Sequence, residues 1–180
     1  MDRDDARQAP ARLDSAAGPA QRTSLRVRPR FCDAQGMVHA ARYYEFFEDA
    51  FIEWLDEHVG GYARLREAGT DLVVVASGCE HANPARLDDR LTVHAQPERR
   101  GRTSLTMSYV IRRGETLIVT GRTTYVAVAG ETGSVPLPEP LTAALDGGPG
   151  LDRATERSLG SLRMVSPIRD DTTAPRGETR

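Results

Sequence analysis

The chain has 180 residues, a formal net charge of −2 and an apolar content of 39%. This length suits one domain of ordinary size with additional terminal segments, and the balanced charge excludes a generally basic nucleic-acid-binding protein. All 24 basic residues are arginines, which excludes Schiff-base chemistry on lysine and a phosphate-binding loop that ends in lysine.

The cysteine content and the hydropathy of the chain indicate where the protein resides. Cys32 and Cys79 are too few for a disulfide scaffold, and neither belongs to a Cys-x-x-Cys zinc motif. The longest mostly apolar run, 72–79, is far too short to span a bilayer. The charged N-terminus lacks the apolar stretch of a secretory signal. We therefore expect a cytoplasmic protein that has neither a membrane nor a nucleic acid as its partner.

The distribution of apolar residues predicts a single folded domain. Residues 1–22 are rich in Ala, Arg, Asp and Pro, which is typical of a disordered leader. Residues 147–180 have a similar character and predict a mostly disordered C-terminal tail. The domain itself is expected over 23–146, where no internal repeat or linker interrupts the chain.

The first predicted elements are a strand and a long helix. Residues 24–31 alternate between apolar and charged side chains, and Pro29 indicates an edge or a strand end. After a loop, residues 43–59 contain no Gly or Pro. Apolar side chains recur there at three- and four-residue steps, namely Tyr43, Phe47, Ala50, Phe51, Trp54 and Leu55. This spacing predicts an amphipathic helix that ends at Gly60.

Every later segment predicts β structure, with strands over 71–82, 87–97, 103–112 and 116–129. The last two are separated by a tight hairpin signal. One strand, one helix and four consecutive strands favour an α+β architecture, in which the helix lies on one face of an antiparallel sheet. We expect one long central helix wrapped by an antiparallel sheet of about five strands.

The loop before the helix carries the chemically informative motif. It reads D-A-Q-G-M-V-H-A over 33–40, followed by Tyr43 and by F-F-E at 46–48. This motif resembles the 4-hydroxybenzoyl-CoA thioesterase family of hotdog-fold proteins. Four later segments resemble the same family, in the right order and spacing: N-P-A-R-L-D-D at 83–89, G-R-T-S at 101–104, G-R-T at 121–123 and P-L-P at 136–138.

The resemblance implies hydrolysis of an acyl-CoA or acyl-carrier-protein thioester, without a metal or another cofactor. It implies that Asp33 is the catalytic carboxylate, acting as nucleophile or as general base on a water. It also implies that the backbone N–H of Ala40 polarises the thioester carbonyl, a role that suits a helix N-terminus. Because a thiolate leaves with a conjugate-acid pKa of about 8.5, one carboxylate can suffice.

Further positions of the motif are implied to bind the substrate, namely Gly36, Val38, His39, Tyr43, Phe47 and Glu48. Structural alternatives stand beside these roles. Asp33 can cap its own loop, and His39 can satisfy a local hydrogen bond. Glu48 can be an ordinary solvated side chain, or it can itself be the active carboxylate, because some related hotdog thioesterases use a glutamate on the helix.

A cluster of arginines and an open sheet edge suggest partners. Arg99, Arg100 and Arg102 suit the phosphates of CoA or of a carrier protein, although solvated arginines in an exposed turn are the structural alternative. A five-stranded sheet leaves one edge open, and hotdog relatives pair two sheets edge to edge. We therefore expect a homodimer or a homotetramer.

Two other functions remain open from the sequence. One is a non-catalytic hotdog module that binds acyl-CoA. The other is a hotdog dehydratase, which needs a histidine and a carboxylate on either side of the substrate. Asp33 and His39 are the close pair that such an enzyme would use.

Overall fold

The computed structural model describes residues 18–130 and 133–147. The predicted leader lies outside the described residues up to residue 17, and the predicted tail lies outside them from residue 148. The elements in chain order are β1 (Gln21–Arg26), α1 (Arg42–Val59), α2 (Tyr62–Glu67), β2 (Asp71–His81), β3 (Arg90–Arg100), β4 (Ser104–Arg113), β5 (Thr116–Val128) and α3 (Glu139–Asp146).

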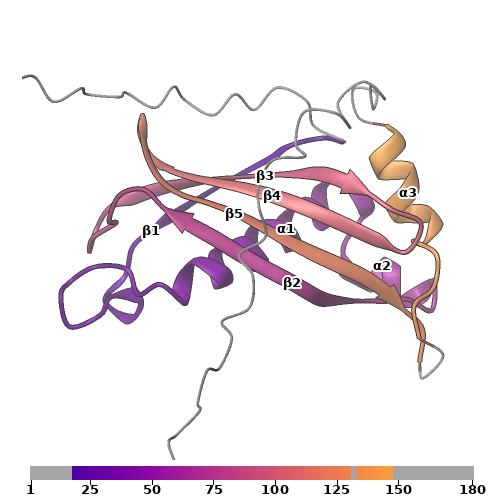
Figure 1. Cartoon of the computed structure of the whole chain (residues 1–180). Helices are drawn as coiled ribbons and strands as arrows, with labels where there is room; N and C mark the ends of the chain where they lie inside the picture. Colours follow the sequence, from indigo (N-terminus) through magenta and orange to yellow (C-terminus); the bar gives the residue numbers. More distant parts are fainter. Residues whose placement is uncertain (1–17, 131–132, 148–180) are drawn as a thin grey trace, which may run out of the picture.

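The five strands form one antiparallel sheet with the order β1-β3-β4-β5-β2. The expected α+β class and the five-stranded antiparallel sheet are therefore confirmed. Alternate residues of β3, β4 and β5 are buried on one face of the sheet, because successive side chains of a strand point to opposite faces. The helix α1 lies across that face (Figure 1).

The helix α1 forms where the apolar spacing predicts it, and it begins one residue earlier, at Arg42. Its buried side chains include all six positions of the predicted apolar face. Gly60 ends it in the left-handed conformation at φ +90°, which a glycine adopts without the penalty of a Cβ atom. Two shorter helices, α2 and α3, accompany it.

The first strand differs from the prediction over 24–31. β1 ends at Arg26, and Pro29–Phe31 forms a single 3₁₀ turn. Pro29 fixes its own φ and has no N–H to donate to a neighbouring strand, so it ends the sheet pairing. At the other end, packing begins before residue 23, since the indole Nε1 of Trp54 donates a 2.7 Å hydrogen bond to the Pro19 carbonyl.

Two stacked aromatic pairs fill the space between α1 and the sheet. The rings of Phe47 and Tyr109 stack with centroids 4.6 Å apart, and those of Phe51 and Tyr125 with centroids 4.1 Å apart. The two phenol oxygens lie 3.2 Å apart in the interior. Burial is the main cause that raises the pKa of Tyr125 to about 12, so both phenols stay neutral. Aromatic stacking therefore packs α1 on the sheet, and the two neutral phenols are joined by a hydrogen bond beside the stacked rings.

The sheet has two edge strands, β1 and β2, and the longer of them is β2, which pairs on one side only, with β5. Three consecutive valines of this strand, Val73, Val74 and Val75, are 42%, 58% and 57% exposed. The pairing with β5 shifts by one residue between Val74 and Ala76. An apolar edge strand of 11 residues presents unpaired backbone groups to a further strand.

None of the described helices has the length and apolar character needed to cross a membrane.

Candidate functional site

The loop between β1 and α1 folds as a small closed turn. The N–H of Asp33 donates to the Met37 carbonyl at 2.8 Å, and the N–H of Gly36 donates to the Asp33 carbonyl at 3.0 Å. Gly36 has φ +72°, a conformation that side chains with a Cβ rarely adopt. The N–H of His39 then bonds to the Phe31 carbonyl at 2.9 Å. The backbone of this loop is thus fixed by its own hydrogen bonds.

The Asp33 carboxylate is held by one of its two oxygens. Oδ1 accepts hydrogen bonds from the N–H of Gln35 at 2.8 Å and from that of Met37 at 3.1 Å. Oδ2 has no hydrogen-bond donor among the residues that the structure describes, and the side chain is half-buried. Asp33 therefore caps its loop, as the structural alternative holds, and still presents a free carboxylate oxygen. The two roles are compatible.

The N-terminus of α1 follows directly and leaves one amide free. The Nδ1 of His39 accepts from the Ala41 N–H at 3.2 Å, and the His39 carbonyl accepts from the Arg42 N–H at 2.9 Å. His39 thus accepts two hydrogen bonds in the turn that leads into α1. Within the described part of the chain, no acceptor lies on the N–H of Ala40. This amide is an unpaired donor at the positive end of α1.

Ala85 ties the loop and the helix together. Its carbonyl accepts from the Val38 N–H at 2.9 Å, and its N–H donates to the Tyr43 phenol oxygen. Burial raises the pKa of the Tyr43 phenol, and the hydrogen bond from Ala85 opposes that rise. Tyr43 and Val38 are 2% and 6% exposed. Both residues therefore position the loop against the first turn of α1.

The structure brings six of the sequence-predicted site residues to this end of the molecule: Asp33, Gly36, Val38, His39, Ala40 and Tyr43. The other two helix positions lie farther along α1. Phe47 is 1% exposed and packs inside the core on Tyr109. Glu48 is exposed. It follows Ala40 by eight residues, which at a rise of 1.5 Å per residue is about 12 Å along the helix axis.

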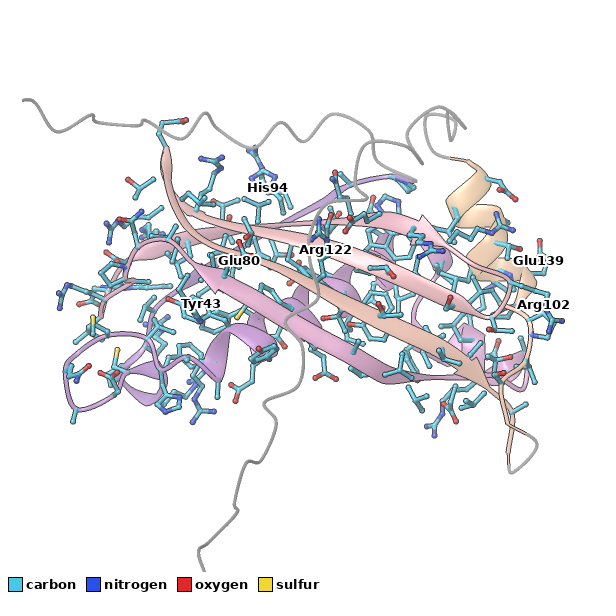
Figure 2. The ribbon with its side chains drawn as sticks, in the orientation of Figure 1. Tyr43, Glu80, His94, Arg102, Arg122 and Glu139 are labelled. Atoms are coloured by element: carbon cyan, nitrogen blue, oxygen red, sulfur yellow. The ribbon has the colours of Figure 1, made fainter. Side chains whose placement is uncertain are left out.

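The predicted phosphate-binding arginines lie at the opposite end of the sheet. Arg99 and Arg100 end β3, and Arg102 lies in the following turn. An 11-residue strand spans about 35 Å, and Figure 2 shows Arg102 at the right-hand end of the molecule and Tyr43 in its left half. Arg100 also forms an ion pair with Asp146 of α3. Within one chain, these arginines and Asp33 are not brought together.

One cluster at the site, formed by Cys79 and His81, was not predicted from the sequence. Cys79 and His81 of β2 lie with Sγ and Nε2 3.5 Å apart. A hydrogen bond with the Cys79 sulfur raises the pKa of the Tyr44 phenol, and the rings of Tyr43 and His81 meet edge to face at 5.1 Å. The signal in the sequence is the spacing Cys-x-His within a predicted strand, because residues two apart share one face.

Comparisons with known proteins identify the family and the fold of the chain. A profile described as thioesterase superfamily matches residues 35–125. A putative esterase from Aquifex aeolicus (strain VF5) is 31% identical over 105 residues, which cover 58% of this chain and 82% of that protein.

Two solved structures share the fold at similar levels of identity. A hypothetical protein from Aquifex aeolicus superposes with a TM-score of 0.66 and 28% identity, over 69% of this chain and 98% of the other. A probable thioesterase from Bartonella henselae superposes with a TM-score of 0.63 and 26% identity, over 67% of this chain and all of the other. The profile match begins at residue 35, after Asp33, and takes in the end of the loop with Ala40, the whole of α1 and most of β2 to β5. Because it spans half of the chain, the chain belongs to the thioesterase superfamily.

Proposed function

We propose that this protein is a thioesterase of the 4-hydroxybenzoyl-CoA thioesterase type, which hydrolyses an acyl-CoA or acyl-carrier-protein thioester to a free acid and a thiol. Membership of the thioesterase superfamily supports thioester hydrolysis in general. The observation that carries the finer proposal is the unpaired N–H of Ala40, which follows the loop that presents Asp33 Oδ2.

The proposed chemistry uses one carboxylate and one amide. The Ala40 N–H at the N-terminus of α1 donates to the thioester oxygen, where negative charge develops as the tetrahedral intermediate forms. Asp33 removes a proton from the attacking water, or attacks the carbonyl carbon itself. The thiol leaves as a thiolate without a strong general acid, because its conjugate-acid pKa is about 8.5.

A panel of acyl thioesters tests this proposal directly. The purified full-length protein is incubated with aliphatic and aromatic acyl-CoA thioesters and with the same acyl groups on a carrier protein, and free thiol is measured with a thiol reagent. We expect catalytic release of thiol from at least one acyl group. Binding of acyl-CoA without any release would instead identify a non-catalytic acyl-CoA-binding module.

The same proposal includes a homodimer in which two sheets join along β2. The exposed valines of this edge strand support it, because they would be covered by the second copy. Val74→Lys places a charge in the middle of the edge, and we expect the protein to become monomeric at micromolar concentration. Light scattering coupled to size exclusion measures the mass.

A matched control keeps the dimer test specific. Leu87→Lys replaces another exposed apolar side chain, 47% accessible, in the turn before β3. We expect this variant to keep the oligomeric state of the unmodified protein. If the unmodified protein is itself monomeric, the proposed pairing along β2 is wrong.

The arginine turn gives a prediction about substrate binding. We expect Arg99→Glu and Arg102→Glu to raise KM without changing kcat, because a remote charge contact contributes equally to the ground state and the transition state. An exposed charge pair contributes up to about 1 kcal/mol, so each KM should rise up to about fivefold. Arg66→Glu on α2 is the control. An unchanged KM for CoA and carrier-protein substrates alike would show that these arginines are ordinary surface residues.

A further inference from the structure

A thiol and an imidazole meet beside the first turn of α1. Cys79 and His81 lie two residues apart on β2, so their side chains share the face of the sheet that α1 covers. The Cys79 Sγ and the His81 Nε2 are 3.5 Å apart. This is a nucleophile within hydrogen-bond reach of a base, and the mechanism proposed above does not use it.

The two aromatic side chains of the first turn of α1 hold this pair in place. The ring of Tyr43 meets the ring of His81 edge to face, with centroids 5.1 Å apart. The Cys79 sulfur lies near the phenol of Tyr44 and is the main cause of the raised pKa of that phenol. The ring of Tyr43 thus orients the base, and the thiol is oriented by its contact with His81.

The pair lies close to the amide proposed to hold the thioester oxygen. Tyr43 and Tyr44 follow Ala40 by three and four residues, which is one helical turn or about 5 Å along the axis. Because the His81 ring contacts Tyr43, the Cys79–His81 pair lies within about one helical turn of Ala40 along the axis of α1.

The second cysteine of the chain lacks these features. Cys32 is half-buried, as Cys79 is. Its thiol faces the Arg28 carbonyl, with 3.7 Å between sulfur and oxygen, which offers neither a base nor a donor to a thiolate. Among the described residues, Cys79 has an imidazole within hydrogen-bond reach, whereas no such contact joins Cys32 to His39, which lines the same pocket.

We propose that Cys79 accepts the acyl group from the thioester substrate, with His81 as its base. The His81 Nε2 takes the thiol proton as the Cys79 sulfur attacks the thioester carbonyl carbon. The bond to the departing sulfur breaks, and the proton passes to that thiolate. The products are a free thiol and an acyl-Cys79 thioester, which water then hydrolyses to the acid with Asp33 as the base. No oxidant or reductant is required, and the exchange replaces one thioester by another.

This inference rests on the proposed thioesterase function. A variant that cannot hydrolyse the acyl-Cys79 thioester allows the acyl transfer to be tested separately from the overall hydrolysis. Asp33→Asn is mixed with benzoyl-CoA and with octanoyl-CoA, and the first turnover is followed by release of CoA. We expect a burst that approaches one CoA per chain, together with an acyl group on the peptide that contains Cys79. Adding Cys79→Ala abolishes the burst, whereas adding Cys32→Ser preserves it. His81→Gln slows the burst while the chain remains folded by circular dichroism.

Alkylation gives a readout that needs no turnover. Iodoacetamide should label Cys79 at least about tenfold faster than Cys32 in the unmodified protein, and His81→Gln should remove this advantage. Equal labelling of the two cysteines overturns the inference. So does thiol release by the unmodified protein when Asp33→Asn shows no acyl-Cys79. If the unmodified protein releases no thiol from any thioester, the proposed function fails as well.

Discussion

Asp33→Asn is expected to lower kcat by about 10²–10⁴, the usual contribution of a positioned acid–base group. KM stays nearly unchanged if Asp33 acts directly on the substrate, and it falls together with kcat if acyl-Cys79 accumulates. The asparagine retains a carbonyl oxygen that can accept the hydrogen bonds of Gln35 and Met37, so the loop keeps its shape. What changes is the free oxygen Oδ2, which is replaced by an amide that has neither charge nor basicity. Steady-state kinetics on the best thioester of the panel measures the effect.

Two further variants distinguish the catalytic role of Asp33 from its capping role. Asp33→Ala removes both oxygens, so we expect the same loss of kcat together with a lower Tm, because two loop amides lose their acceptor. Glu48→Gln should leave kcat within a few-fold of the original, since Glu48 lies two helical turns beyond Ala40. Loss of turnover in Glu48→Gln but not in Asp33→Asn would place the active carboxylate on α1.

Elements that local spacing specifies were predicted well from the sequence. The apolar spacing over 43–59 predicted α1 to within one residue, and the alternation of side chains predicted four of the strands to within a few residues. The exceptions depend on backbone chemistry or on distant contacts. Pro29 ends β1 early, and the short helix α3 has no long apolar pattern of its own.

The candidate site was predictable only in part, for a related reason. Asp33, Gly36 and Ala40 lie within eight consecutive residues, so one motif could identify them together. Cys79 and His81 meet Tyr43 and Tyr44 across more than thirty residues of sequence, and only the tertiary fold joins them. A sequence motif identifies residues that lie close together along the chain, whereas a contact that forms only in the tertiary fold has to be found in the structure.

The position of the arginine turn illustrates how topology limits such reasoning. The Asp33 loop follows β1, and β1 runs antiparallel to β3. The start of β3 therefore lies at the Asp33 end, and Arg99 and Arg100 lie at the other. The arginines can therefore lie near an Asp33 loop only if that loop belongs to the second copy of a dimer. The prediction that β2 joins two copies and the prediction that Arg99→Glu and Arg102→Glu raise KM thus test the same dimer.

The packing of α1 on the sheet depends on the absence of one side chain. Gly121 of β5 lies directly under the ring of Phe47, and a Cβ atom placed on it would come 2.3 Å from the Phe47 Cζ and 2.4 Å from its Cε2. Such distances are far inside van der Waals contact. The ring cannot tilt away freely, because it also stacks on Tyr109 at 4.6 Å.

Gly121→Ala is accordingly expected to destabilise the fold by about 1–3 kcal/mol, as overpacking of a close-packed core does. At this chain length, each kcal/mol corresponds to a fall in Tm of roughly 2–4 °C. Gly78→Ala is the matched control in the neighbouring strand, because its added Cβ meets no atom within 4 Å. If the Phe47 ring is the obstacle, Phe47→Leu should reduce the cost of Gly121→Ala in a double-mutant cycle measured by urea unfolding. Equal costs in both backgrounds would show that the helix can shift to accept the methyl group.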